Sequence, residues 1–294
     1  MLSNLDRDFY SSLLKSKLSL ESRELISIVL NQTAITRNKS IWNKILNFSD
    51  SMKTPLNSLK KNGYLVLNSD IFSEVAAEIR LYADKHSLMN KPYGSEPIRY
   101  LTEVSKMLSV KRLLNSVDLY SLVSLYLGAP VSIYNVGAWI QYPGYKGKAP
   151  NTQLWHRDRD DFSFLKLFMN VNNVTKANGP HAYLPGSHVS NNLSSIFSCA
   201  SDPHKQQYVN GSIHKFFTDK DLYDLGLNIQ PKLWEGPSGL TFLEDTRGFH
   251  RAYTPETEPR LMFAVTWSVG KGYAPDNLVD PSRAVLEALH TNTV

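Results

Sequence analysis

The chain has 294 residues, of which 42% are hydrophobic and 20% charged, a balance typical of a folded globular protein and not of a disordered one. The net charge of +5 is mildly basic, but no block of lysine and arginine is interleaved with aromatic residues. This pattern argues against a nucleic-acid partner and favours a small, anionic substrate. The single cysteine, Cys199, excludes an internal disulfide and any zinc site built on several thiolates.

The sequence carries no signal for a membrane or for export. No apolar run is long enough to cross a bilayer, and the opening MLSNLDRDFYSSLLKSK includes acids and lacks the apolar stretch of a secretory signal. A lone cysteine fits a reducing compartment, so we expect a cytoplasmic protein. No feature of the sequence specifies an oligomeric state.

The first half of the chain is predicted to be mainly helical. Residues 1–57 form an N-terminal helical extension, with a one-sided apolar pattern over 19–32, and the main domain covers 58–294. Asn62-Gly63 indicates a turn before a short strand at 64–67. A further helix buries one apolar face, and another helical region covers 103–127. The residues expected on the buried face are Phe72, Val75, Ala76, Ile79 and Ala83.

After Pro130 the chain is rich in β-branched and aromatic runs separated by Pro, Gly and Asn. We expect strands at 131–142, 164–174, 238–244 and 260–269, and short strands with such turns predict a β-sandwich or barrel. The irregular stretch 189–230 is a candidate lid, because long insertions in compact domains are often functional.

The segment LWHRDRDD (154–161) raises the question of a metal site. In an extended chain, side chains two residues apart point to the same side, so His156 and Asp158 can bind one ion while Arg157 points away. The H-x-D pattern alone is more often a histidine beside an exposed acid. His250, at the end of an apolar run, offers a third ligand. Two histidines and one carboxylate suit non-haem Fe(II), although a catalytic zinc site uses the same set.

Arg260 favours the iron alternative. It opens the last predicted strand, and we expect an antiparallel return to bring it beside the strand that carries His250. A guanidinium there would bind the distal carboxylate of a 2-oxo acid. The competing interpretation is a surface arginine paired with Glu256 or Glu258.

HRD (156–158), NGPHAYLPGSH (178–188) and GFHRAYTPETEPR (248–260), in this order, resemble the phytanoyl-CoA dioxygenase family of Fe(II)/2-oxoglutarate-dependent oxygenases. The opening NGYLVLNSDIFSEVAAEI is also similar, and the resemblance covers about 58 to 270. It implies a mainly β fold with flanking helices, built on a double-stranded β-helix (a jelly roll, cupin-like). It also implies Fe(II), 2-oxoglutarate and O2 as cofactor and co-substrates.

The resemblance assigns roles to individual residues. It implies His156, Asp158 and His250 as catalytic metal ligands, Arg260 as the 2-oxoglutarate anchor and, more loosely, Gln141 as a further 2-oxoglutarate contact. We interpret His181 and His188 as structural residues or supports of the ligands. An aspartate at position 158 argues against halogenation, because halogenases of this superfamily have a small residue there.

The other residues of LWHRDRDD receive different interpretations. Arg157 and Arg159 either bind an anionic substrate or balance Asp160 and Asp161, which we expect at the surface or in a turn; Trp155 is expected to form a wall.

The function expected is hydroxylation of an unactivated C–H bond in a small molecule, with release of succinate and CO2. Desaturation, cyclisation or epimerisation would begin with the same hydrogen abstraction. A zinc or manganese hydrolase or isomerase on the same ligands, and a non-catalytic β-helix binding module, are the alternatives from other classes.

Overall fold

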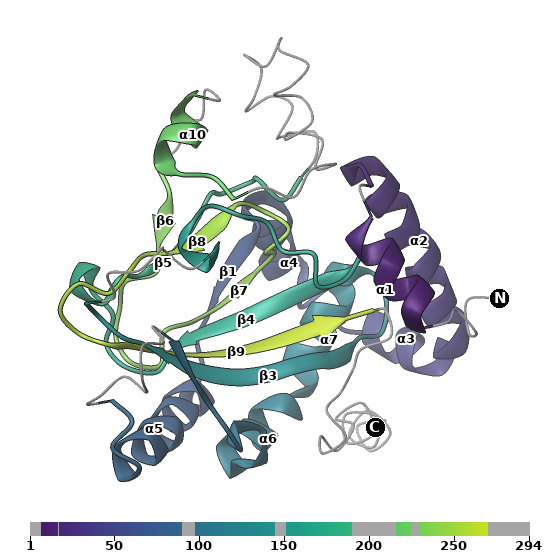
Figure 1. Ribbon diagram of the computed structural model, residues 1–294. Helices are drawn as coiled ribbons and strands as arrows, with labels where there is room; N and C mark the ends of the chain where they lie inside the picture. The colour runs from purple at the N-terminus through teal and green to yellow at the C-terminus, as the bar shows by residue number, and fades with distance from the viewer. Residues whose placement is uncertain are drawn as a thin grey trace.

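Two antiparallel β-sheets lie at the centre of the computed structural model, which describes residues 7–16, 18–89, 98–144, 151–189, 216–224 and 230–269 (Figure 1). The large sheet has six strands in the order β1-β7-β4-β9-β3-β2, and the small sheet has three in the order β6-β5-β8. The strands are β1 (Tyr64–Leu67), β2 (Ile98–Leu101), β3 (Ser132–Gln141), β4 (Phe164–Asn170), β5 (His181–Tyr183), β6 (Lys232–Leu233), β7 (Thr241–Glu244), β8 (His250–Ala252) and β9 (Arg260–Ser268).

Helices flank the large sheet on one face and at one end. They are α1 (Arg7–Lys15), α2 (Leu20–Arg37), α3 (Lys39–Leu46), α4 (Lys53–Asn62), α5 (Asp70–Lys85), α6 (Leu108–Leu114) and α7 (Val117–Leu127), whereas α10 (Asp219–Asp224) lies on the side of the small sheet. In Figure 1, α5 and α6 lie below the large sheet, α1 to α3 stand at its right-hand end, and the small sheet lies above it. Two antiparallel sheets with outer helices confirm the predicted double-stranded β-helix class.

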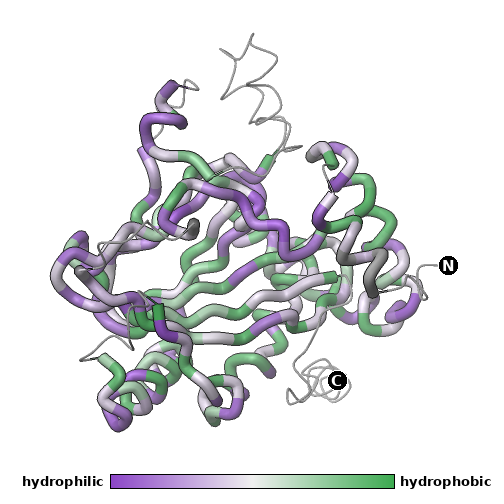
Figure 2. Tube along the Cα trace, viewed as in Figure 1, coloured by the Kyte–Doolittle hydropathy of each residue, from purple (hydrophilic) through white to green (hydrophobic). Residues whose placement is uncertain are grey.

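Strict alternation along the strands separates a core face from a cavity face. In β9, Leu261, Phe263, Val265 and Trp267 belong to the main hydrophobic core, whereas Arg260, Met262, Ala264 and Thr266 border a cavity. The same division places Leu165 and Leu167 of β4 in the core and Lys166 and Phe168 at the cavity. Successive side chains of a strand point to opposite faces, so one strand serves both purposes. Figure 2 shows the hydrophobic residues concentrated along these strands and on the helices beneath them.

The helix predicted to bury Phe72 to Ala83 forms as α5 and buries its apolar face. Phe72 is 6% exposed and Val75, Ala76, Ile79 and Ala83 are fully buried in α5. The predicted turn is also present: Gly63 ends α4 in the left-handed conformation with φ of +80°. A side chain at position 63 would also collide with Tyr183, so both the backbone conformation and the available space require glycine here.

Three expectations differ from the structure. The helical region 103–127 is broken into a 3₁₀ turn, α6 and α7, with Ser116 capping α7 through the backbone N–H of Leu119. The strand expected over 164–174 ends at Asn170. Arg260 does not return by a hairpin: β8 pairs with β5 in the small sheet, while β9 pairs with β3 and β4 in the large one. The loop 253–259 therefore crosses from one sheet to the other.

The predicted domain boundary near residue 57 stays a prediction. Helix α4 runs across that position, and Ile45, Leu56 and Leu59 belong to the same hydrophobic core as α5 and the large sheet. Of the candidate lid, 190–215 and 225–229 lie outside the described residues. Within the described part of the chain, no helix is long and apolar enough to span a bilayer.

Candidate metal centre and cavity

Backbone pairing brings the three predicted metal ligands together. His156 and His250 form an isolated antiparallel bridge, in which each backbone N–H donates to the other residue's carbonyl at 3.0 Å. Asp158 is held by its N–H, which donates to the carbonyl of Thr246 at 2.8 Å. His156 and Asp158 are thus hydrogen-bonded to the segment 246–250, which fixes the spacing of all three side chains.

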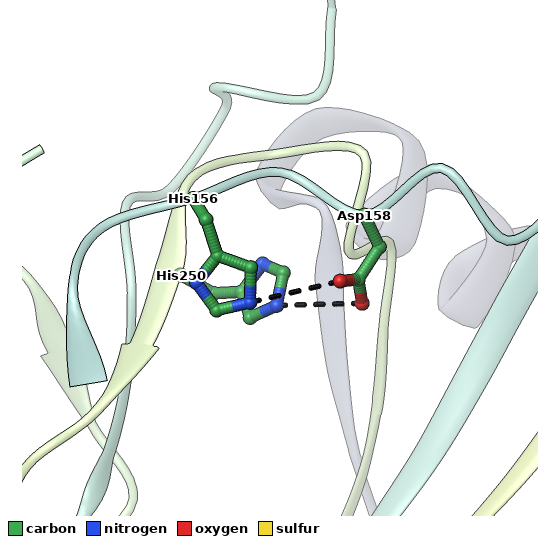
Figure 3. Close-up of side chains that lie close together, drawn as sticks. All are labelled: His156, Asp158 and His250. Carbon is green, nitrogen blue, oxygen red and sulfur yellow. Dashed lines mark ion pairs between the residues drawn. The ribbon is translucent and has the colours of Figure 1, made fainter. Parts of the chain in front are cut away.

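The three side chains converge on one point (Figure 3). Nε2 of His156 lies 3.6 Å from Oδ1 of Asp158, and Nε2 of His250 lies 3.4 Å from Oδ2. Potential ligand atoms from the three residues all lie within 4.8 Å of one another. Such a set of two imidazoles and one carboxylate leaves further coordination positions to a substrate or water.

Each histidine is held in the tautomer that a metal needs. Nδ1 of His156 lies 2.8 Å from the carbonyl of Leu154, and Nδ1 of His250 lies 3.0 Å from the carbonyl of Gly248. A carbonyl only accepts, so Nδ1 donates in both rings and Nε2 keeps its lone pair facing Asp158. This support of the ring orientation is typical of metal-binding histidines.

The charge states also suit metal binding. Burial lowers the pKa of His156 to about 3, which keeps this imidazole neutral. Burial alone would raise the pKa of Asp158, but Lys166 and the two histidines hold it well below its usual range. For His250, burial acts to lower the pKa and the neighbouring Asp158 raises it, with a net upward shift. A neutral histidine and an ionised aspartate are the ligand forms that bind a metal.

Lys166 of β4 was not singled out in the sequence. Its ammonium lies 2.6 Å from Oδ2 of Asp158 and 2.7 Å from Oδ2 of Asp160, and it borders the cavity. Burial acts to lower its pKa, but these two carboxylates raise it above its usual value, so the lysine is charged. The signal was present in FLKLFMN, where a lysine interrupts an otherwise apolar strand.

A cavity of about 250 Å³ lies beside the three ligands, between the two sheets. Strands β2, β3, β4 and β9 of the large sheet and β5 and β8 of the small sheet contribute its lining. Tyr100, Trp139 and Phe168 supply aromatic walls, and Arg260 and Gln141 supply polar groups. Concave sites with a few converging polar groups are where small molecules bind.

Arg260 and Gln141 form the polar end of this cavity. They face each other in the β3–β9 register, and Nη2 of Arg260 donates to Oε1 of Gln141 at 2.5 Å. Arg260 is 1% exposed, and its Nε and Nη1, like Nε2 of Gln141, are buried without a hydrogen-bond partner. No carboxylate of a described residue pairs with it, and burial lowers its pKa to about 9. The alternative of a surface arginine paired with Glu256 or Glu258 is therefore wrong.

The two histidines of NGPHAYLPGSH lie outside the three-residue set. His181 lines the cavity, but its Nε2 lies 2.8 Å from Oε1 of Glu244. His188 lies farther off, with Nε2 at 3.0 Å from the carbonyl of Lys60. Glu244, which ends the apolar run TFLE, was also not singled out.

The remaining residues of LWHRDRDD lie away from the cavity lining. Nε of Arg157 donates to the carbonyl of Arg247 at 2.6 Å, and its guanidinium lies over the ring of Phe249. Arg159 also does not border this cavity, within the described chain. Trp155 is 2% exposed and donates through Nε1 to Asp219. The surface expectation for Asp161 is wrong: it is 4% exposed and accepts hydrogen bonds from the hydroxyls of Tyr10 and Ser268.

Comparison with known proteins gives structural neighbours alone. No protein-family profile matches the sequence, and no curated protein matches it. EctD from S. alaskensis, solved with 2-oxoglutarate and 5-hydroxyectoine, is 16% identical, with a TM-score of 0.50 over 74% of this chain and 76% of that chain. The epimerase SnoN, solved with Fe3+, alpha ketoglutarate and nogalamycin RO, is 14% identical, with a TM-score of 0.49 over 79% and 93%. The EctD likeness establishes a shared fold.

Proposed function

We propose that this protein is an Fe(II)/2-oxoglutarate-dependent oxygenase that acts on a small molecule. The observation that carries the proposal is the pairing, in one cavity, of a metal-ligand set with a buried guanidinium that lacks a counter-ion. His156, Asp158 and His250 would hold the iron. Arg260 and Gln141 would hold the distal carboxylate of 2-oxoglutarate, whose oxygens satisfy their orphaned N–H groups.

Bound iron, 2-oxoglutarate and O2 would together supply the oxidant that removes hydrogen from a substrate carbon. In hydroxylation one oxygen atom of O2 enters the alcohol and the other enters succinate, as 2-oxoglutarate loses CO2. The protein residues would fix the ligand geometry, neutralise charge through Lys166 and line the space with Tyr100, Trp139 and Phe168. Hydroxylation is the reaction we propose first; desaturation, cyclisation and epimerisation share its opening step. The phytanoyl-CoA dioxygenase family remains the resemblance that motivates the assignment.

Anaerobic addition of Fe(II) and 2-oxoglutarate tests this proposal. We expect the weak visible charge-transfer band of the iron–2-oxo acid chelate, and its loss in the Asp158→Ala/His250→Ala double variant. A folded wild-type protein without the band would refute the assignment, as would a band that persists in the double variant.

A zinc or manganese hydrolase would use the same three ligands. Activity of the zinc- or manganese-loaded protein that needs no 2-oxoglutarate would support that second function. The orphaned N–H groups of Arg260 favour the oxygenase, since hydrolysis has no general need for a second anion beside the metal.

A further inference from the structure

Glu244 and His181 form a buried acid–histidine pair on the cavity wall that neither holds the metal nor anchors 2-oxoglutarate in the proposed function. Glu244 is fully buried and His181 is 8% exposed, and Nε2 of His181 lies 2.8 Å from Oε1 of Glu244. The other carboxylate oxygen, Oε2, accepts a hydrogen bond from Nε1 of Trp234 at 3.0 Å. Apolar residues of similar volume would fill this space at lower desolvation cost, so stability alone does not explain the pair.

The pair determines which nitrogen of His181 is available. With Oε1 of Glu244 as the acceptor, Nε2 carries the hydrogen that faces Glu244. In the neutral ring Nδ1 then holds a lone pair, and no described residue forms a hydrogen bond with it.

Packing holds this ring in place beside the metal ligands. The His181 ring stacks on Phe168 with centroids 4.9 Å apart and planes at 30°. It lies 5.6 Å from the ring of His250, measured between centroids, and it borders the same cavity as Arg260. A fixed acceptor nitrogen thus belongs to the wall of the site.

We infer that His181, oriented by Glu244, accepts a hydrogen bond from the substrate, which therefore carries a hydroxyl or N–H group close to the carbon that reacts. The inference rests on the proposed function, because it assumes that the substrate enters beside the metal. The carboxylates and keto group of 2-oxoglutarate only accept hydrogen bonds, so they do not satisfy Nδ1. The substrate class is accordingly an alcohol, amine or amide.

The first test reads the tautomer without any turnover. Protein labelled with ¹⁵N-histidine and loaded with Zn(II) and 2-oxoglutarate is measured by long-range ¹H–¹⁵N correlation, with the His181→Phe variant identifying the signal. We expect a neutral His181 with hydrogen on Nε2, and a shift of the tautomer balance in Glu244→Gln. A ring protonated on Nδ1 would overturn the inference.

The second test separates a substrate contact from a structural role. Succinate formation is screened with a library of alcohols and amines and with their O-methylated or quaternary N-methylated counterparts, which lack the donor. Wild type should turn over the donor-bearing members, and His181→Phe/Glu244→Gln should raise their KM about tenfold or more, the loss of one hydrogen bond. In that variant the carbonyl of the introduced side-chain amide still accepts from Trp234. His181→Asn, which keeps a side-chain acceptor, should recover part of the loss.

The two proposals fail separately. The charge-transfer band should still form in His181→Phe/Glu244→Gln, because the metal ligands and Arg260 remain. Absence of the band in wild type refutes the oxygenase assignment. A normal band combined with equal turnover of methylated and unmethylated compounds refutes the role of His181 alone.

Discussion

The ammonium of Lys166 lies 2.6 Å from Oδ2 of Asp158, the same oxygen that faces Nε2 of His250 at 3.4 Å. A lysine from the large sheet thus contacts the carboxylate that would bind the metal. Lys166 is also the strongest influence that lowers the pKa of Asp158 against the effect of burial.

Lys166→Met should therefore weaken metal binding. Without the ammonium the pKa of Asp158 rises, and protons compete with the metal for the carboxylate. We expect a roughly tenfold to hundredfold loss of affinity, larger at pH 5.5 than at pH 7.5, on the scale seen for partners of metal ligands. Calorimetric titration with Co(II) measures it. Lys106→Met, which removes an exposed partner of Glu103, is the matched control, and equal affinities in both variants would contradict the role of Lys166.

Arg260→Met should remove 2-oxoglutarate binding without harming the fold. The buried guanidinium lacks a carboxylate partner, so its loss relieves a desolvation cost that partly offsets the lost contact with Gln141. We expect the Tm of the ligand-free variant to be at or above that of wild type. Added 2-oxoglutarate should raise the Tm of iron-loaded wild type and leave that of the variant unchanged. Arg112→Met, at an exposed pair with Glu74, serves as control. A normal 2-oxoglutarate shift in Arg260→Met would contradict the anchor.

The metal-free protein should lose stability as the pH falls. Burial lowers the pKa of His156 from 6.5 to about 3. Between these pH values this imidazole is therefore protonated in the unfolded chain and neutral in the folded one. This group contributes stability that is present above pH 6.5 and is lost as the pH falls, by up to about 1.4 kcal/mol per pH unit. His181 acts in the same direction, and His250, whose pKa is raised, acts against it.

Urea unfolding in EDTA at pH 7 and pH 5 measures this dependence. His156→Phe should flatten it, whereas His86→Gln, at an exposed position, should leave it as in wild type. The same slope in wild type and His156→Phe would show that other groups carry the effect.

Asp161→Ala should destabilise the fold rather than the reaction. Asp161 accepts hydrogen bonds from the hydroxyls of Tyr10 and Ser268 and from the N–H of Phe162, so its loss removes an acceptor shared by three buried donors. We expect a cost of about 3 kcal/mol in the free energy of unfolding. Asp50→Ala, at an exposed position, should cost less than about 0.5 kcal/mol. A change of similar size in both variants would contradict this account.

The sequence predicted what depends on local pattern. Runs of β-branched and aromatic residues between Pro, Gly and Asn located β3, β4, β7 and β9, and the spacing of His156 and Asp158 placed two ligand candidates on one side of the chain. The end of an apolar run and the start of the last strand offered His250 and Arg260, and the resemblance to a known family assigned their roles. The contacts that could not be predicted from the sequence join distant segments. Glu244 of the large sheet contacts His181 of the small sheet, and Asp161 accepts a hydrogen bond from Tyr10 of α1. Local periodicity carries no information on such pairs.

The loop before Arg260, which crosses from the small sheet to the large one, could not be predicted from local pattern either. A Pro- and Glu-rich loop between two apolar runs is typical of a hairpin, yet here it connects strands in different sheets. The position of Arg260 in the cavity follows from the pairing of β9 with β3, which places it opposite Gln141. Pairing partners, unlike strand ends, are set by the global topology.

The two-sided pattern of β9 makes this strand a natural target for protein engineering. Met262, Ala264 and Thr266 border the cavity, whereas Leu261, Phe263 and Val265 are fully buried on the opposite side. A combinatorial library at the first three positions would vary the shape of the space next to Arg260 while leaving the main hydrophobic core, which contains Leu261, Phe263 and Val265, unchanged. Alternate residues of β9 thus border either the cavity or the main hydrophobic core, so substitutions at the cavity positions can be made without changing the core positions.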